Sequence, residues 1–139
     1  MFQRDYVMRI IQQFVQALLT VTNLRRDKKY NDAEVKLATA SRFYLKLEPE
    51  LLLMGGAQWL LDHFTGVNGF LEAERCLMAA DLLYEQSCIL RAKGAPDLQM
   101  EKRCLLLYEA SLPQCKELQT EERLKKISDL KQFLSLNSN

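Results

Sequence analysis

Apolar residues recur at intervals of three and four over long stretches of this chain, which is the period of an α-helix. The first stretch runs from about Gln3 to Arg25. Its apolar face is formed by Val7, Ile10, Phe14, Ala17, Val21 and Leu24. Only five Gly and three Pro interrupt 139 residues, so helix breakers are few. The pattern predicts an all-α fold, and the length is that of one helical domain covering residues 1–139.

Breaks in the pattern divide the chain into four helical segments. Two of them are helix pairs, at about residues 3–46 and 70–112, each joined by a short polar turn. Short irregular helices are expected over residues 50–64, and a C-terminal helix over residues 120–135. Such pairs pack as antiparallel hairpins when the connecting turn is short.

Several residues mark the expected ends of these helices. Asn31 opens an N-x-x-E sequence of the capping-box form, which predicts a helix that begins at Asn31 and stops at Pro49. Asp97 and Thr120 are candidate N-caps, because their side-chain oxygens can accept hydrogen bonds from the first turn. Gly94 is placed to end the preceding long helix.

A second apolar stripe, formed by Ile11, Val15 and Leu18, lies beside the first on the N-terminal helix. Together the two stripes make a face wider than one helix–helix contact requires. We therefore expect this helix to be central to the core or to be shared with a second subunit.

Residues 24–29 read LRRDKK, a basic turn with two interpretations. As the solvated turn between two helices, its cations would stabilise the C-terminal end of the first helix. The whole chain carries 19 Lys and Arg against 18 Asp and Glu, so there is no general attraction to nucleic acid, and we favour the solvated turn. The alternative is a nucleic-acid binder that uses Arg4, Arg9, Arg25, Arg26, Lys28 and Lys29.

Few residues offer the chemistry of an active site or a metal site. His63 is the only histidine, and no glycine-rich phosphate loop is present. Four cysteines lack the spacing of a zinc site and are expected as buried thiols: Cys76, Cys88, Cys104 and Cys115. We expect no enzyme, no cofactor and no metal. An unrecognised enzyme or small-molecule pocket around Trp59 and His63 is the remaining alternative, although a sole Trp in an apolar helix is usually part of the core.

Two apolar segments are candidates for targeting or membrane insertion. The N-terminal segment is interrupted by Arg4, Asp5 and Arg9, which a signal peptide would lack in its apolar region. Residues 51–61 fall short of the roughly 20 apolar residues that span a bilayer. We expect a cytoplasmic protein with no membrane partner.

The second helix of each pair carries a spacing of small and large residues that resembles the tetratricopeptide repeat. The first pair has Ala33, Leu37 and Ala40, and the second has Cys104, Tyr108 and Ser111 at the same offsets. The first helices depart from the motif, with Ala17, Thr20, Val21 and Leu24 at its bulky-Leu-Gly-Tyr positions, and Pro113 comes early. The resemblance implies antiparallel helical hairpins packed as a degenerate tetratricopeptide-like right-handed array.

The N-terminal third, MFQRDYVMRIIQQFVQALLTVTNLRRDKKYNDA, resembles the start of an uncharacterised family of bacterial proteins found mainly in Gram-positive bacilli and clostridia. That resemblance implies a cytoplasmic helical protein of the same tetratricopeptide-like character. It brings no catalytic residues.

These observations favour a non-catalytic helical module that binds a protein, including the possibility of a homodimer. Stacked hairpins form extended grooves without special chemistry, and the first helix of each pair would line such a groove. On that basis the candidate binding residues are Tyr6, Arg9 and Gln13 from the first pair and Tyr84 and Arg91 from the second. Aromatic residues and Arg are the types that dominate protein interfaces.

Overall fold

The computed structural model describes residues 2–137, with side chains from Asp5 onward. Within that range the chain forms helices and no extended strand, which confirms the predicted all-α class. The α-helices are α1 (Phe2–Arg26), α2 (Tyr30–Ala40), α3 (Pro49–Met54), α4 (Ala57–His63), α5 (Ala73–Ala92), α6 (Leu98–Ser111) and α7 (Glu121–Asn137). A π-helical turn at Ser41–Leu45 extends α2, and 3-10 turns at Leu112–Gln114 and Lys116–Leu118 join α6 to α7. Among residues 2–137, no helix combines the length and the apolar character needed to cross a membrane.

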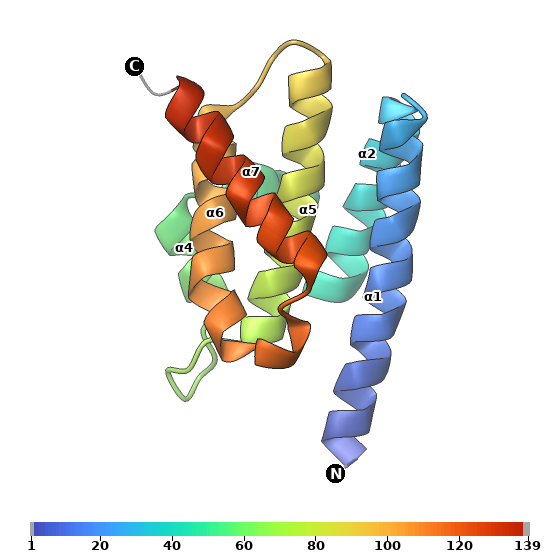
Figure 1. The fold of residues 1–139 in the computed structure, drawn as a ribbon. Coiled ribbons are helices and arrows are strands. Elements are labelled where there is room, and N and C mark those ends of the chain that lie inside the picture. Colours follow the sequence, from blue (N-terminus) through green and yellow to red (C-terminus); the bar gives the residue numbers. More distant parts are fainter. Residues whose placement is uncertain (1, 138–139) are drawn as a thin grey trace.

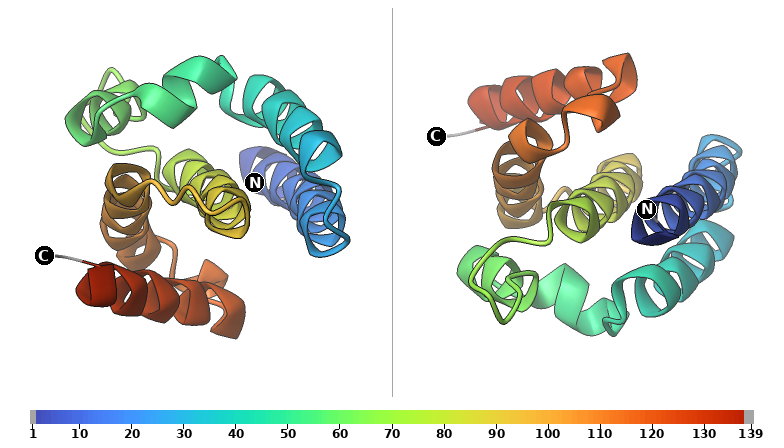
Figure 2. Two further views of the ribbon diagram at one scale, coloured as in Figure 1. Left: turned by 90° about the horizontal axis from the view of Figure 1, so that it is seen from above. Right: turned by 90° about the horizontal axis from the view of Figure 1, so that it is seen from below.

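Helix α5 lies at the centre of the fold (Figure 1). Figure 2 shows α1 and α2 on one side of it and α6 with α7 on the other, while α3 and α4 cover a third side. Helix α5 packs against α1, α2, α3 and α6, and α6 in turn packs against α4 and α7. The core therefore surrounds one helix instead of lying between two layers.

The sequence of α5 explains this central place. Its apolar residues are spread around the helix instead of forming one stripe, which is typical of a helix buried on all sides. The fully or nearly fully buried apolar side chains are Ala73, Cys76, Leu77, Met78, Ala79, Ala80, Leu82, Leu83 and Ile89. Four polar side chains of α5 are buried with them: Asp81, Glu85, Gln86 and Ser87. Such groups need partners, because an unpaired buried charge is costly.

Helices α1 and α2 form one antiparallel pair, and α5 and α6 form the other (Figure 1). The residues that carry the spacing of small and large side chains lie inside both pairs: Ala33, Leu37, Ala40, Cys104, Tyr108 and Ser111 are each at most 2% exposed. Small side chains at such positions let neighbouring helices approach closely.

Helix α2 begins at Tyr30, one residue before the predicted start, and the capping-box prediction is wrong. Lys29 occupies the N-cap position, and no side chain caps the helix there. The reason lies in the preceding turn: Lys28 adopts a left-handed φ of 63°, and the Lys29 N–H donates to the Leu24 carbonyl at 2.9 Å. This compact closure of α1 returns the chain to a helical path before Asn31.

Pro49 begins α3 instead of stopping the preceding helix. The helical path already ends at Leu45, because Lys46 adopts a left-handed φ of 54°. The buried Ser41 hydroxyl donates to the Leu47 carbonyl at 2.7 Å and holds this turn. Proline is favoured in the first turn of a helix, where its missing N–H costs nothing.

The long central helix starts at Ala73, three residues later than predicted. Residues 64–72 form a loop in which the Glu72 N–H donates to the Phe64 carbonyl at 2.7 Å and the Gly66 N–H to the Phe70 carbonyl at 2.8 Å. Phe70, the first residue of the predicted range, therefore lies in this loop and is 73% exposed.

Three other predicted helix ends are confirmed. The Asp97 carboxylate accepts from the Met100 N–H at 3.0 Å at the start of α6. The Thr120 hydroxyl accepts from the Arg123 N–H at 3.2 Å at the start of α7. Gly94 follows α5 with φ +76°, a conformation that favours glycine.

We expect Leu37→Ala to lower the free energy of unfolding by about 2–5 kcal/mol, because it leaves a cavity between α1, α2 and α5. Val35 is 63% exposed on the same helix, so Val35→Ala is the matched control. It should change the free energy of unfolding by less than about 0.5 kcal/mol. Urea unfolding followed by circular dichroism measures both. Equal effects of the two substitutions would contradict the packing described here.

Candidate functional site

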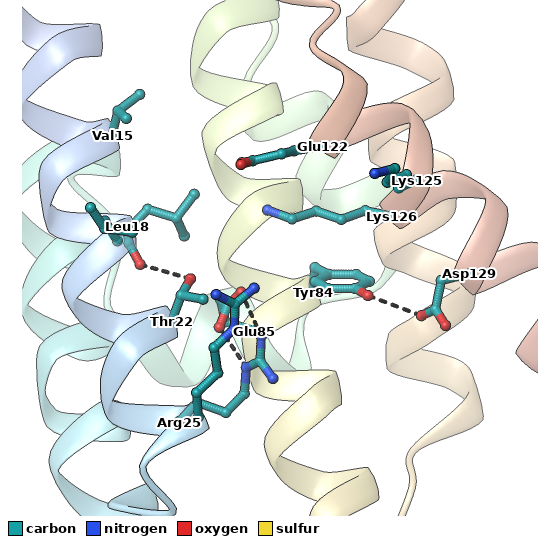
Figure 3. A pocket seen from close by; sticks show the side chains of 12 residues that line it. Val15, Leu18, Thr22, Arg25, Tyr84, Glu85, Glu122, Lys125, Lys126 and Asp129 are labelled. Carbon is teal, nitrogen blue, oxygen red and sulfur yellow. Dashed lines mark hydrogen bonds and ion pairs between the residues drawn. The ribbon is translucent and has the colours of Figure 1, made fainter.

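A groove of about 660 Å³ opens between α1 and α7, with α5 as its floor. Figure 3 shows side chains from these three helices converging on the space between them. Its volume lies within the roughly 300–1,000 Å³ range of ligand-binding clefts. The groove is the candidate functional site of this protein.

The two walls of the groove differ in chemistry. The α1 wall presents Val15, Leu18, Leu19 and Thr22, followed by Arg25 and Arg26. Val15 is 43% exposed and Leu19 is 48% exposed, so part of the wide apolar face of α1 remains uncovered. The α7 wall presents Glu122, Lys125, Lys126 and Asp129. One wall is therefore mainly apolar and the other is charged.

The floor of the groove is formed by Tyr84 and Glu85 of α5. The Tyr84 hydroxyl donates to the Asp129 carboxylate at 3.0 Å (Figure 3). Burial raises the pKa of Tyr84, and the negative charge of Asp129 raises this pKa further, so the phenol remains a neutral donor. Lys126 Nζ lies 5.4 Å from the centre of the Tyr84 ring, and this cation–π contact places the lysine over the floor.

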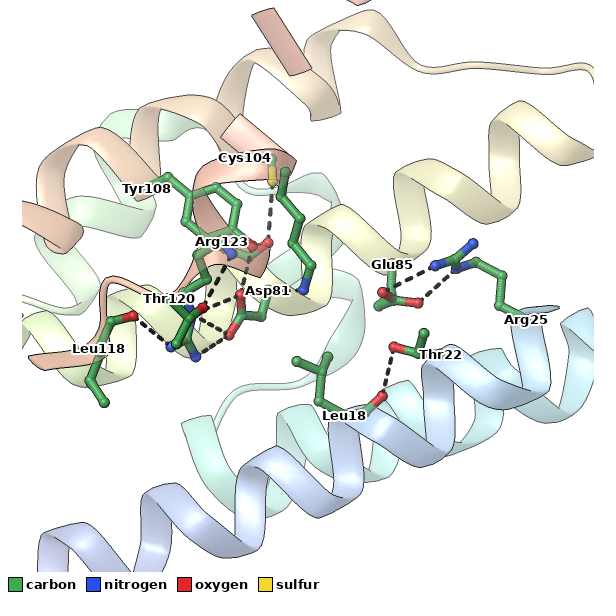
Figure 4. Close-up of polar contacts among 12 residues, drawn as sticks. Leu18, Thr22, Arg25, Asp81, Glu85, Cys104, Tyr108, Leu118, Thr120 and Arg123 are labelled. Carbon is green, nitrogen blue, oxygen red and sulfur yellow. Dashed lines mark hydrogen bonds and ion pairs between the residues drawn. The ribbon is translucent and has the colours of Figure 1, made fainter. Parts of the chain in front are cut away.

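Glu85 is fully buried and is paired with Arg25 of α1. Arg25 Nε donates to Glu85 Oε1 at 2.7 Å, and Nη2 reaches Oε2 at 3.5 Å (Figure 4). Burial opposes the charge of Arg25, but the hydrogen bond and attraction of Glu85 outweigh it and raise the pKa of Arg25. The side chain of Arg25 is thus partly buried in an ion pair, although the sequence placed it in a solvated turn. Arg26 and Lys28 are exposed, as expected for such a turn.

Asp81, one turn earlier on α5, is also fully buried and is paired with Arg123 of α7. Arg123 Nη2 donates to Asp81 Oδ2 at 2.7 Å, and the buried Tyr108 hydroxyl donates to Oδ1 at 2.6 Å. Lys126 Nζ lies 3.9 Å from the same carboxylate, instead of pairing with Glu122 as the i,i+4 spacing suggests. Figure 4 shows Asp81 and Glu85 on the same side of α5, turned toward α7 and α1 respectively.

A third buried carboxylate, Glu101 of α6, is paired with Arg91 of α5. Arg91 Nε donates to Glu101 Oε2 at 3.0 Å, and Arg91 Nη1 donates to Asp129 Oδ2 at 2.9 Å. Its guanidinium also lies 3.9 Å from the centre of the Phe133 ring. Arg91 therefore joins α5 to both α6 and α7.

We call Asp81–Arg123, Glu85–Arg25 and Glu101–Arg91 the three buried ion pairs. The first pair joins α5 to α7 and the second joins α5 to α1, so both connect helices that are distant in the sequence. The third pair joins the consecutive helices α5 and α6. Removing one partner of such a pair costs about 3–5 kcal/mol because it leaves an uncompensated buried charge. These pairs therefore fix where α1 and α7 lie relative to the floor of the groove.

The structure separates the five predicted binding residues. Tyr84 lies in the floor of the groove. Arg91 is linked to Tyr84 because both side chains donate hydrogen bonds to Asp129. Tyr6 is 64% exposed and lines a second pocket of about 480 Å³ between α1 and the start of α5. Arg9 and Gln13 are exposed on α1 and line neither pocket. The proposed role of these residues in binding stays a prediction.

Several groove residues were not predicted from the sequence. Leu19 and Lys125 belong to helix faces whose exposure depends on which neighbours cover them. Asp81 and Glu85 carried a usable signal, because charges within a helix that is apolar on all other sides require buried partners. The identity of those partners, Arg123 and Arg25, depends on the tertiary fold.

Trp59 is 45% exposed, which corrects the expectation that it belongs to the core. Its ring stacks on His63 with centroids 5.4 Å apart and an interplanar angle of 13°. Phe64, the next residue along, takes the core position and is fully buried. Gly55 accounts for this local arrangement, since a Cβ there would lie 2.5 Å from the Leu51 carbonyl oxygen and 3.0 Å from the indole.

The cysteines are thiols, as predicted: Cys76, Cys104 and Cys115 are buried, and Cys88 is half-buried. Burial raises the pKa of Cys76 to about 12 and that of Cys115 to about 11. Protonated thiols are poor nucleophiles. Within the part of the chain that the structure describes, no group of three or more His, Cys, Asp or Glu side chains is arranged to hold a metal ion.

No protein-family model matches the chain, and neither the curated proteins nor the solved structures yield a significant match.

We expect Arg123→Met to lower the free energy of unfolding by about 3–5 kcal/mol, because the buried Asp81 side chain would lose its arginine partner. In the double variant Asp81→Leu with Arg123→Met, most of this loss should disappear. The control is Arg42→Ala, which breaks an exposed ion pair with Glu48 and should cost less than about 1 kcal/mol. Urea unfolding of the full double-mutant cycle measures the coupling, and additive effects would contradict the buried pair.

Stability should also fall in alkaline solution. The pKa of Cys76 is raised from 9.0 to about 12 in the folded protein, so the folded state favours the protonated thiol. Its contribution is complete below pH 9 and is lost as the pH rises toward 12, because only the unfolded chain releases the proton in that range.

The difference in unfolding free energy between wild type and Cys76→Ala should therefore shrink by about 1–2 kcal/mol between about pH 8 and about pH 10.5. Urea unfolding in the presence of a reductant measures it at each pH. A difference that stays constant over this range would exclude a buried, protonated Cys76.

Proposed function

We propose that the protein is a non-catalytic helical module that binds a segment of another protein in the groove between α1 and α7. The observation that carries the proposal is the uncovered apolar wall of α1. Val15 and Leu19 are each more than 40% exposed, and together with Leu18 they face one cleft. Isolated exposed apolar residues are ordinary, whereas an apolar strip in a groove is typical of interaction sites.

The proposal includes the tetratricopeptide-like right-handed array. In that arrangement α1, α5 and α7 are the first helices that line the groove, and α2 and α6 are the second helices behind them. The antiparallel pairs and the buried small residues Ala33, Ala40 and Ser111 support it. The insertion of α3 and α4 between the pairs departs from a regular repeat.

The interior chemistry supports a role without catalysis. Each of the three buried carboxylates is engaged by an arginine, and the thiols have raised pKa values. The nucleic-acid alternative is weakened by Arg25, because its charge is taken up by Glu85. The unpaired thiols fit the cytoplasmic location that we propose, since a reducing compartment keeps cysteines as thiols.

A homodimer is one form that this function can take. The exposed start of α1, with Tyr6, Arg9 and Gln13, is the surface that we propose for self-association. Size-exclusion chromatography with light scattering would then give about twice the chain mass of 16.2 kDa. In Tyr6→Ala with Arg9→Ala the dimer should be lost, whereas an unchanged mass in a folded variant would exclude this surface.

The groove itself is tested by site-specific photocrosslinking in cells. A photoreactive residue at Leu19 should form adducts with a protein, because Leu19 lies in the groove. The same residue at Val35, which is 63% exposed on α2, is the control and should form none of these adducts. Gel shift and mass spectrometry identify the products.

Identical adducts at both positions would contradict a specific groove. Adducts that nuclease removes would support the nucleic-acid alternative instead.

A further inference from the structure

We propose that the segment bound in the groove is an amphipathic α-helix with an acidic flank. Its apolar face would lie on α1 and its acidic flank against Lys125 and Lys126 of α7. The inference rests on the proposed function and specifies the chemistry of the partner.

The dimensions of the two walls suit a helical ligand. Positions 15, 18, 19 and 22 on α1 and positions 122, 125, 126 and 129 on α7 each follow the i, i+3, i+4, i+7 pattern. The α7 row extends for about 10 Å along its helix, and the α1 row, continued to Arg26, for about 16 Å. These lengths correspond to two to three turns of a helix laid between the walls. Residues 2–137 contain no sheet edge to which an extended peptide could add.

The apolar half of the recognition comes from α1. Leu18 is partly buried and Leu19 about half exposed, so the wall presents ridges that another helix can pack against. A ligand with apolar side chains at the same spacing would bury Val15 and Leu19, which the fold leaves uncovered.

The acidic preference follows from which charges of the groove are already neutralised. Among its carboxylates, Glu85 is paired with Arg25, and Asp129 accepts from Tyr84 and Arg91. Among its cations, Arg26 and Lys125 are exposed and have no ion-pair partner within the described residues. Lys126 Nζ lies 3.9 Å from the Asp81 carboxylate, a long contact, and Arg123 already neutralises the charge of Asp81.

The single charge of Arg91 is shared between Glu101 and Asp129, so Asp129 is only partly neutralised. Three cations, Arg26, Lys125 and Lys126, therefore face Glu122 and part of the charge of Asp129, and the groove keeps a net positive charge. An incoming acidic flank would find complementary charge, whereas a basic flank would be repelled.

The test uses two synthetic peptides that share one leucine stripe at helical spacing. One carries Glu on its flank and the other carries Lys at the same positions. Fluorescence anisotropy with the full chain should show the Glu peptide binding at least about tenfold more tightly, which corresponds to about 1.4 kcal/mol. The preference should decrease as salt is added, because Arg26 and Lys125 are exposed.

Substitutions in the groove separate the two halves of the recognition. Arg26→Glu with Lys125→Glu should reverse the preference between the peptides. The charge-matched control is Lys36→Glu with Lys102→Glu, at exposed positions on α2 and α6, and it should leave the preference unchanged. Leu19→Lys should weaken both peptides. Thermal unfolding by circular dichroism verifies that every variant is folded.

Each other result overturns a defined part of the inference. Equal binding of both peptides, with loss in Leu19→Lys, would overturn the acidic preference and leave the groove as a binding site. Absence of binding by either peptide, with protein adducts still formed at Leu19, would overturn the helical ligand alone. Absence of both binding and adducts would overturn the proposed function as well.

Discussion

The structure depends on the need to compensate carboxylates inside a helix that is buried on all sides. The side chains of Asp81 and Glu85 are fully buried on helix α5, so each requires a cation from a neighbouring helix. Arg123 supplies it from α7 and Arg25 from α1. Apolar packing alone favours many arrangements of helices around α5, whereas hydrogen-bonded ion pairs restrict the rotation and register of α1 and α7.

The same ion pairs give the groove its chemical character. Because Glu85 is occupied by Arg25 and Asp81 by Arg123, these carboxylates of α5 leave positive charge on the lysines of α7. The apolar wall has a related origin: α1 is positioned by Arg25 near its C-terminal end and by Phe14 and Val21 in the core. The face of α1 that carries Val15 and Leu19 is therefore turned toward α7, but α7 does not pack closely enough against it to cover these side chains.

The sequence predicted the elements whose signals are local. Helical periodicity gave α1 nearly to its ends, and the caps at Asp97 and Thr120 depend on side chains within three residues of the groups they bind. Predictions failed where a helix boundary depends on the backbone conformation of a turn or on contacts between residues that are distant in the sequence. The left-handed turn at Lys28 moved the start of α2, and the loop that joins Phe64 to Glu72 removed Phe70 from α5. Of the five predicted binding residues only Tyr84 lines the groove, because the exposure of the α1 face depends on where α7 lies.

The three buried ion pairs also constrain how this fold can diverge. Loss of the carboxylate at position 81 would remove the ion-pair partner of Arg123, and loss of Arg123 would leave Asp81 with only the more distant Lys126, at 3.9 Å. Substituting both with apolar residues is far less harmful than substituting either one. Descendants of this sequence should therefore exchange positions 81 and 123, 85 and 25, and 101 and 91 in concert, so that covariation in an alignment would mark the contacts between helices more clearly than conservation of any single residue.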